Sequence, residues 1–185
     1  MKLKKVSWYL KTLALKFEYG NVGKKSYIGK PIFIQSKRKL YVGNRVRIYP
    51  GLRAETPGVH SKIVFGNDIS IGQNLHIVSY NTLVIQDGTT ISGNVFISNV
   101  DHDYRQLNIS KLKQKLIGKE TKIGRNCFIG YGAVILPGTV IGDNCIIGAN
   151  AVVKGKFSDN CVIAGVPAKV IKKYSPISKK WERIK

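Results

Sequence analysis

An aliphatic residue recurs at every sixth position through much of the second half of this 185-residue chain. The run comprises Ile117, Ile123, Ile129, Ile135, Ile141, Ile147 and Val153. Glycine follows most of these residues, and a small residue such as Cys127 or Ala133 lies four positions after each of the first six. A less regular form of the same repeat occurs upstream, at Val59, Phe65, Ile71 and Ile77 and then at Ile85, Ile91 and Ile97. Weaker matches occur at Ile28 and Val42. The repeat therefore covers most of residues 28–153.

A period of six matches neither the 3.6-residue turn of an α-helix nor the simple alternation of a strand. One short strand and one tight turn per six residues form one face, and three faces close a triangular prism. Each coil of the prism buries the core of its neighbour. The glycines and the Asn and Asp residues near them supply corners, because they tolerate positive φ. We therefore expect an all-β coil in which the glycines serve turns rather than phosphate loops.

Composition excludes several classes of protein. Apolar residues make up 43% of the chain, a fraction that can form one core, and no apolar run reaches the roughly 18 residues that span a bilayer. No small-residue cleavage site follows the basic N-terminal segment, so we expect no secretion signal. The cysteines number three and lack metal-type spacing, which argues against a disulfide framework or a zinc site and fits a reducing cytosol.

The net charge of +21 is concentrated at the two ends of the chain. Residues 1–50 carry 13 Lys and Arg against Glu18 alone, and residues 169–185 carry seven against Glu182 alone. In the first 17 residues, apolar residues at helical spacing alternate with lysines, which predicts a short basic amphipathic helix. Two placements of this helix stay open. It packs on its own domain or a neighbouring subunit, or it binds an anionic membrane surface, which Trp8 and Tyr9 beside lysines also suit.

The repeat is interrupted between Ile97 and Ile117, where the sequence contains the cluster Asp101-His102-Asp103-Tyr104. Interruptions of a repeat protein map to loops, and loops on a rigid scaffold often hold ligand-handling residues. By spacing alone, a histidine between two aspartates is more often a solvated loop residue. For His60 and His76 we expect surface or interface positions.

The predicted organisation has three parts. Residues 1–22 form the N-terminal helix, residues 23–166 form the coil domain with an inserted loop at about 101–116, and residues 167–185 form a basic C-terminal tail.

The strings CFIGYGAVILPGTVIGDNCIIGANAVV and VIAGVPAKVI, together with the DHDY loop, resemble the hexapeptide-repeat acyltransferases. Within that superfamily the chain is most similar to the branch that acetylates O-antigen, capsule or related bacterial surface sugars. The resemblance runs from about Val59 to Ile171. It implies a left-handed parallel β-helix, a homotrimer, acetyl-CoA as co-substrate, and active sites between neighbouring prisms. The expected reaction is acetyl transfer to a hydroxyl of a sugar, in a cell-surface polysaccharide or its precursor.

The same resemblance implies the site residues. His102 matches the catalytic histidine of the family, whose neutral imidazole takes a proton from the acceptor hydroxyl. Asp101 or Asp103 could orient that imidazole. The positions that match coenzyme contacts are Phe128, where many relatives have Trp, Gly130, Tyr131 in place of Ser, Ala149, Lys154 and Lys169. No metal is expected.

Three alternatives remain in view. Serine acetyltransferases share the fold but carry a sizeable helical domain ahead of the coils, where this chain has only about 20 residues. A non-enzymatic polyanion-binding module has the charge in its favour, although the coils offer few side chains to stack on bases, so nucleic acid is not expected. A zinc carbonic anhydrase needs three converging histidines. This chain has three in all, without a His-x4-His pair. We expect a cytoplasmic enzyme, peripheral to the inner face of the membrane if the N-terminal helix binds lipid.

Overall fold

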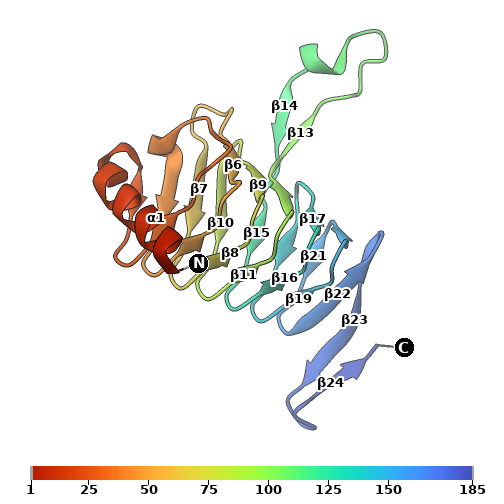
Figure 1. The fold of residues 1–185 in the computed structure, drawn as a ribbon. Coiled ribbons are helices and arrows are strands. Elements are labelled where there is room, and N and C mark those ends of the chain that lie inside the picture. The colour runs from red at the N-terminus through yellow and green to blue at the C-terminus, as the bar shows by residue number, and fades with distance from the viewer. Residues whose placement is uncertain (1, 185) are drawn as a thin grey trace.

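The computed structural model describes residues 2–184, which form a three-sided parallel coil with a helix at one end (Figure 1). The chain visits three sheets in turn. Sheet A contains β1 (Asn21–Val22), β4 (Leu40–Val42), β7 (Lys62–Phe65), β10 (Thr82–Ile85), β15 (Lys122–Ile123), β18 (Val140–Ile141) and β21 (Lys156–Phe157). Sheet B contains β2 (Tyr27–Ile28), β5 (Arg47–Ile48), β8 (Ser70–Ile71), β11 (Thr90–Ile91), β16 (Phe128–Ile129), β19 (Ile146–Ile147) and β22 (Cys161–Gly165). Sheet C contains β3 (Phe33–Ile34), β6 (Arg53–Glu55), β9 (His76–Val78), β12 (Phe96–Ser98), β17 (Val134–Ile135) and β20 (Val152–Val153). Single-turn 3-10 helices span Lys16–Glu18, Lys37–Lys39 and Lys111–Lys113.

The six-residue beat corresponds to one inward-facing residue per strand. Ile123 lies opposite Ile141 in sheet A, and Ile129 lies opposite Ile147 in sheet B. All four are buried, and they belong to one continuous hydrophobic core that runs along the prism axis. Burial of a full aliphatic side chain contributes about 1.5–3 kcal/mol, so stacked aliphatic residues provide the main stabilisation of the coils.

The small position of each repeat also points inward. Cys127, Cys145 and Cys161 are free and buried, as predicted for the first two. The Sγ atom of Cys127 lies 3.2 Å from the carbonyl oxygen of Gly142. A hydrogen bond to Cys145 and burial raise the pKa of the Cys127 thiol. A protonated, enclosed thiol is a core group rather than a nucleophile.

Asparagines occupy many of the corners in the left-handed conformation. Asn126, Asn144 and Asn160 all have φ between 53° and 58°. Their side chains form a ladder along one edge, with Asn144 Nδ2 donating to Asn160 Oδ1 at 3.1 Å. Gly130 is required for a different reason, because a Cβ there would lie 2.6 Å from the backbone nitrogen of Ala149 in the next coil. The corner chemistry predicted from sequence therefore sets the spacing between coils.

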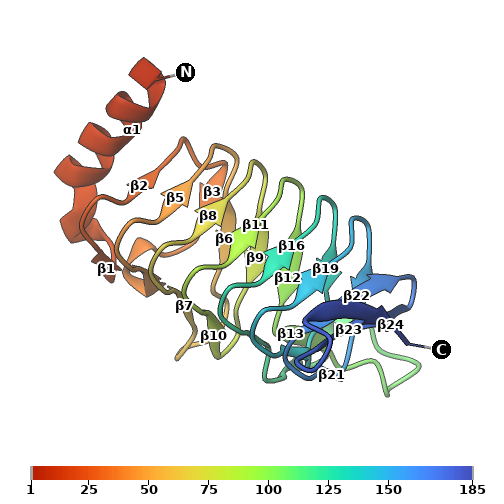
Figure 2. The same ribbon diagram turned by 90° about the horizontal axis from the view of Figure 1, so that it is seen from below.

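The open N-terminal end of sheet B is covered by α1 (Lys2–Leu15), which lies across the first coil (Figures 1 and 2). Thr12 Oγ1 accepts a hydrogen bond from the backbone N–H of Ile28 at 2.9 Å and donates to the carbonyl of Trp8 at 2.8 Å. The Trp8 ring packs between Tyr27 and Tyr49, with centroid distances of 6.0 and 6.3 Å. The helix thus protects a strand edge that would otherwise offer unpaired backbone groups.

Two positions of the predicted rhythm lie outside the core. Val59 is exposed, because residues 56–61 form a widened corner before β7. Ile117 lies on β14 (Leu116–Gly118), opposite Asp101, in a hairpin that leaves the prism. The expectation that these two residues continue the interior stack was wrong, since the chain leaves the regular coil at both places.

The segment expected as a basic tail continues sheet B. Strand β23 (Ala168–Ser175) pairs antiparallel with β22, and β24 (Lys180–Arg183) pairs antiparallel with β23. The rings of Tyr174 and Trp181 meet edge-on at 5.6 Å. Figure 2 shows this hairpin at the end of the prism opposite α1. Within residues 2–184, no helix is long and apolar enough to cross a membrane.

Candidate active site

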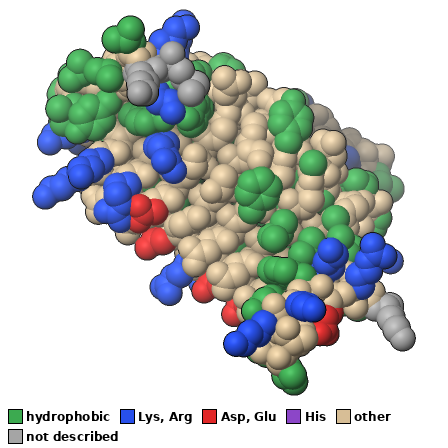
Figure 3. Space-filling model, turned by 60° about the horizontal axis from the view of Figure 1, so that its bottom comes forward, with side chains coloured by type: hydrophobic (Ala, Val, Ile, Leu, Met, Phe, Trp, Pro, Cys, Tyr) green, Lys and Arg blue, Asp and Glu red, His purple; other side chains and the backbone are tan. Residues whose placement is uncertain are grey.

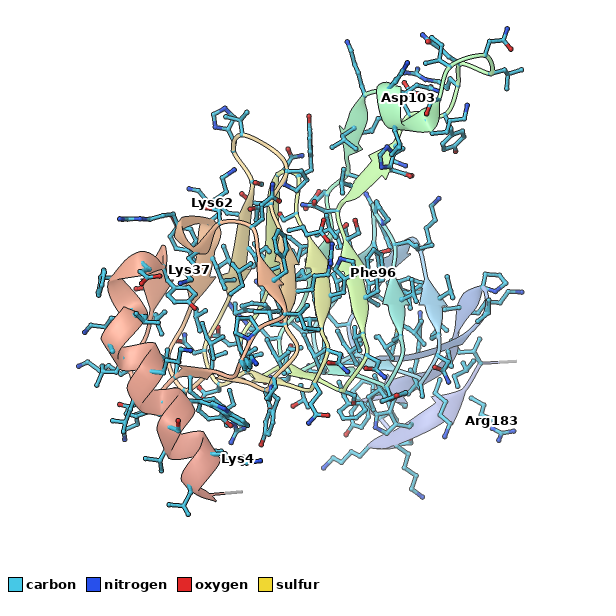
Figure 4. All side chains as sticks on the ribbon, turned by 45° about the horizontal axis from the view of Figure 1, so that its top comes forward. Lys4, Lys37, Lys62, Phe96, Asp103 and Arg183 are labelled. Atoms are coloured by element: carbon cyan, nitrogen blue, oxygen red, sulfur yellow. The ribbon has the colours of Figure 1, made fainter. Side chains whose placement is uncertain are left out.

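A hairpin leaves the prism at the corner between sheets C and A. It is formed by β13 (Val100–His102) and β14, which pair antiparallel and bring His102 opposite Leu116. In Figure 1 it projects away from the coils, and Figure 4 shows Asp103 on it, well outside the sheet that carries Phe96. The interruption of the repeat therefore forms the protrusion that the sequence predicts.

His102 lies exposed at the beginning of this protrusion. Its backbone N–H donates to Asp101 Oδ1 at 3.0 Å, while its imidazole makes no hydrogen bond to any of residues 2–184. The ring is therefore available to an incoming hydroxyl. A cavity of about 220 Å³ beside it is lined by Asp101, His102, Asp103, Tyr104, Arg105, Ile117 and Lys119.

Both carboxylates that flank His102 are paired with cations. Lys119 Nζ donates to Asp101 Oδ2 at 3.0 Å, and this contact holds the pKa of the Asp101 carboxyl below its usual value. Arg105 lies 2.6 Å from Asp103 and lowers the pKa of that carboxyl to about 2. Lys154 lies between β20 and β21, at the same corner, and its positive charge also lowers the pKa of Asp101. The orienting role expected of either aspartate stays a prediction.

Three of the residues that match coenzyme contacts lie at another corner of the prism, whereas Lys154 lies at the same corner as His102. Gly130 and Tyr131 follow β16, and Ala149 follows β19, so all three lie between sheets B and C. Tyr131 is exposed, and its hydroxyl accepts a hydrogen bond from Asn94 Nδ2. Within one chain, sheet C therefore separates these residues from the corner that carries His102.

An apolar strip leads from Phe128 across the outer face of sheet B. Phe128 lies beside Ile146, Ile146 beside Val162, and Val162 beside Lys172 in the strand register. Phe128 is 46% exposed although it is a large aromatic residue. Lys169, on the same strand as Lys172, pairs with Ala164. Lys172 was not predicted as a site residue, because its position beside the strip depends on the antiparallel turn after β22.

A histidine–carboxylate pair lies on the outer face of sheet C. His76 Nε2 is 2.9 Å from Glu55 Oε1, and the His76 ring packs edge-on against Phe96 at 5.0 Å. Burial alone would raise the pKa of Glu55, but hydrogen bonds from Arg53 and His76 outweigh it and hold that pKa below its usual value. His76 was expected on the surface or at an interface, and its partner was missed. The two residues are 21 positions apart, so only the coil register could have shown the contact.

Comparisons with known proteins agree with the repeat and the coil fold described above. Residues 120–155 match the family model described as bacterial transferase hexapeptide (six repeats). WbbJ of Escherichia coli (strain K12), which is assigned to lipopolysaccharide biosynthesis as an O-acetyl transferase, is 33% identical over 160 residues that cover 83% of this chain and 81% of WbbJ. This chain belongs to the hexapeptide-repeat acyltransferases. The branch predicted from the repeat and the GVPAKVI string, that of bacterial sugar and polysaccharide O-acetyltransferases, is confirmed.

Solved structures support the fold of this hexapeptide-repeat acyltransferase. A variant of AntD, an N-acyltransferase from Bacillus cereus, solved with dTDP and coenzyme A, superposes with a TM-score of 0.74 at 20% identity over 91% of both chains. A galactoside acetyltransferase in complex with coenzyme A matches with a TM-score of 0.51 at 29% identity over 72% of both chains. The predicted left-handed parallel β-helix is confirmed, since a coil of the opposite hand could not superpose over that length.

Proposed function

We propose that this enzyme transfers the acetyl group of acetyl-CoA to a hydroxyl of a sugar in a bacterial cell-surface polysaccharide or its precursor. The observation that carries the proposal is the exposed, uncommitted imidazole of His102 beside a cavity at the base of the hairpin. The assignment of WbbJ to lipopolysaccharide biosynthesis supports the acceptor class, and the galactoside acetyltransferase supports a sugar hydroxyl. We further propose residues 23–166 as the catalytic unit, acting in the cytoplasm.

The residues around the apolar strip fit the coenzyme. A narrow pantetheine arm needs an exposed apolar surface along stacked coils, which Phe128 and Ile146 provide. Its phosphates need cations, and Lys169 and Lys172 lie on the strand at the end of the strip. When bound, acetyl-CoA supplies the activated thioester carbonyl. The roles of Gly130, Tyr131 and Ala149 near this arm, and of Lys154 beside His102, stay part of the proposal.

In the proposed mechanism, His102 acts as a general base. Its neutral imidazole takes the proton of the acceptor hydroxyl while that oxygen forms a bond to the thioester carbonyl carbon. The carbon–sulfur bond then breaks, and the imidazolium returns the proton to the leaving thiolate, which departs as free coenzyme A. No acyl-enzyme is needed, which agrees with the buried state of all three cysteines.

We propose that each active site is shared by two copies in a homotrimer. The separation of His102 from Tyr131 by sheet C supports this, because the C–A corner of one copy can meet the B–C corner of the next. Exposed apolar residues at the hairpin tip, Leu107 and Leu112, are suited to contact with a second copy.

Mixing two inactive variants tests the shared site. His102→Ala removes the base, and Phe128→Asp together with Ile146→Asp blocks the strip. Unfolded and refolded together in equal amounts, they should recover about a quarter of wild-type acetyl transfer, because in a random mixture each interface has that chance of combining two intact halves. Each variant refolded alone serves as the control. No recovery in a mixture that light scattering shows to be trimeric contradicts the shared site.

A further inference from the structure

Helix α1 has two apolar faces, and only one of them contacts the prism. The inner face carries Trp8 and Thr12, which pack on the first coil through Tyr27, Tyr49 and the backbone of Ile28. The apolar residues at helical spacing in the first 17 positions lie on the opposite, outer face of the helix. Packing on the prism therefore leaves the amphipathic stripe free.

This outer stripe consists of Leu3, Val6, Leu10, Leu13 and Phe17. Their exposed fractions range from 48% to 87%, although all five are large apolar residues. Spacings of three and four residues place Leu3, Val6, Leu10 and Leu13 in one line along α1, over about 15 Å, and Phe17 follows in the 3-10 helix Lys16–Glu18. Figure 3 shows apolar side chains gathered at this end of the molecule, with Lys and Arg side chains around them. A continuous exposed apolar line of this kind marks an interaction surface.

Lysines lie along both flanks of α1, in the two grooves between the helix and the prism. The groove between α1 and the first corner, about 330 Å³ in volume, is lined by Leu13 together with Lys16, Lys24 and Lys25. The groove on the opposite side of the helix, about 210 Å³ in volume, includes Lys11 and Lys30.

Negative charge is nearly absent from this end of the chain. The first 30 residues contain eight lysines and one carboxylate, Glu18, which is already paired with Lys37. Within the first 30 residues, no carboxylate other than the paired Glu18 offsets the lysines that flank α1.

We propose that the outer stripe, together with the lysines in the two grooves beside α1, docks the enzyme onto an anionic lipid surface. The apolar residues would enter the boundary between headgroups and acyl chains, and the lysines would meet the phosphates, the arrangement by which interfacial amphipathic helices bind. The face of α1 that would be polar in an isolated interfacial helix packs here on the prism, and the outer stripe stays exposed. This proposal concerns location and does not depend on which sugar accepts the acetyl group.

Charge decides between lipid and a second copy of the chain. The three-and-four spacing of the stripe also suits a helix–helix seam, but such seams usually place acidic and basic residues opposite one another. Here the positions that would border a seam carry Tyr9 and Lys16 on one side and Ser7 and Ala14 on the other, with no carboxylate. A seam between copies would therefore gain no pairs of opposite charge, whereas anionic headgroups neutralise the lysines that flank α1.

Vesicle co-sedimentation of the full-length protein tests the proposal. The probe is vesicles of phosphatidylcholine with 30% phosphatidylglycerol, compared with pure phosphatidylcholine, at low and high salt. Wild-type protein should bind the anionic vesicles at least about tenfold more tightly, and the difference should shrink as salt screens the lysines over about 8 Å. The triple variant Val6→Gln, Leu10→Gln, Leu13→Gln should lose at least about tenfold in binding.

A matched pair of charge variants separates this surface from net charge alone. Replacing Lys16, Lys24 and Lys25 with Gln should weaken binding strongly, at about fivefold per lysine. Replacing Lys173, Lys179 and Lys180, in the hairpin at the opposite end of the prism, removes the same charge and should change binding less than twofold. Far-UV circular dichroism and thermal unfolding of each variant, measured without substrate, establish that it is folded.

Three results would overturn the proposal. One is equal binding by the wild type and the folded stripe variant. Another is equal weakening by the two charge variants, which would indicate attraction without docking. The third is absence of vesicle binding together with a fall in oligomer mass when the stripe is substituted, which would assign the stripe to contacts between copies. Brominated lipids give an independent reading, because a Trp introduced by Leu10→Trp should be quenched by them.

Discussion

Lys119 Nζ lies 3.0 Å from Asp101 Oδ2, so that an ion pair joins β13 to the residue that follows β14, where the hairpin leaves the prism. The other oxygen of Asp101 accepts the backbone N–H of His102. The carboxylate therefore fixes the chain that carries the histidine. We therefore expect Asp101 to act as a positioning residue for His102.

Substitution of Asp101 should lower the rate without weakening coenzyme binding. Asp101→Asn loses the ion pair to Lys119, and a displaced imidazole is expected to reduce kcat by about 10- to 100-fold. The KM for acetyl-CoA should stay within about twofold, since the proposed coenzyme strip lies on the outer face of sheet B, away from Asp101. Asp103→Asn is the matched control and should have a smaller effect, because its partner Arg105 lies farther along the hairpin. A rise in KM with unchanged kcat for Asp101→Asn would contradict this assignment.

His102→Ala should abolish most acetyl transfer. Loss of a general base reduces the rate by about 10²- to 10⁴-fold, while an exposed side chain adds little to folding. Initial rates with acetyl-CoA and a panel of surface sugars measure the first effect, and thermal unfolding and coenzyme binding measure the second. His60→Ala, which changes another exposed loop histidine, should retain full activity. A twofold loss for His102→Ala would exclude His102 as the base.

Sequence alone predicts the regular coils because their length is constant. Lys122 lies opposite Val140, 18 positions on, so three six-residue units complete one turn. Earlier coils are longer and uneven, since Tyr41 lies opposite Val64, 23 positions on. The extra residues widen corners such as 56–61, and this is why the coils at the N-terminal end give only a faint rhythm and why Val59 was misplaced.

The site is less predictable from sequence than the coils. His102 is found because it lies in the interruption, and the resemblance to known acyltransferases marks it. The contact of Asp101 with Lys119 spans the hairpin, and that of His76 with Glu55 spans one irregular coil. Such contacts depend on which residues of neighbouring strands lie opposite one another. The six-residue repeat does not predict that register where the coils differ in length. The inner face of α1 was likewise missed, because Trp8, which the sequence suggested for a membrane boundary, packs instead on Tyr27 and Tyr49.

The interior stack should dominate stability. Ile129→Ala removes a fully buried side chain in the middle of the prism and should cost about 2–5 kcal/mol in the free energy of unfolding. Phe128→Ala, on the adjacent position of the same strand, removes a larger but half-exposed side chain and should cost about 1 kcal/mol. Urea unfolding followed by circular dichroism compares them. A larger loss for Phe128→Ala would mean that the outer strip is buried in the assembled protein.

Glu55 should make stability depend on pH in the acid range. Its pKa is lower in the folded chain than in the unfolded one, so the stabilisation is complete above the unfolded pKa and is lost as pH falls through the folded pKa. Glu55→Gln should therefore be less stable than wild type at pH 7, by less than about 1 kcal/mol, and the two should converge as the pH falls through the folded pKa of Glu55. Thermal unfolding from pH 7 to pH 3 measures the difference. A gap that stays constant over this range would contradict a role for the charge of Glu55.

Thr12 should be needed to join α1 to the prism. Its hydroxyl is the partner of the Ile28 N–H at the edge of sheet B, where no preceding strand exists. Thr12→Val keeps the shape of the side chain but leaves that buried N–H without an acceptor, which should cost about 1–3 kcal/mol. Thr90→Val, on the outer face of the same sheet, has no such partner among residues 2–184 and should change stability by less than about 0.5 kcal/mol. Urea unfolding gives both values, and protease cleavage after Lys16 reports whether the helix detaches before the coils unfold. Equal stability of Thr12→Val and Thr90→Val would show that Trp8 packing alone secures the helix.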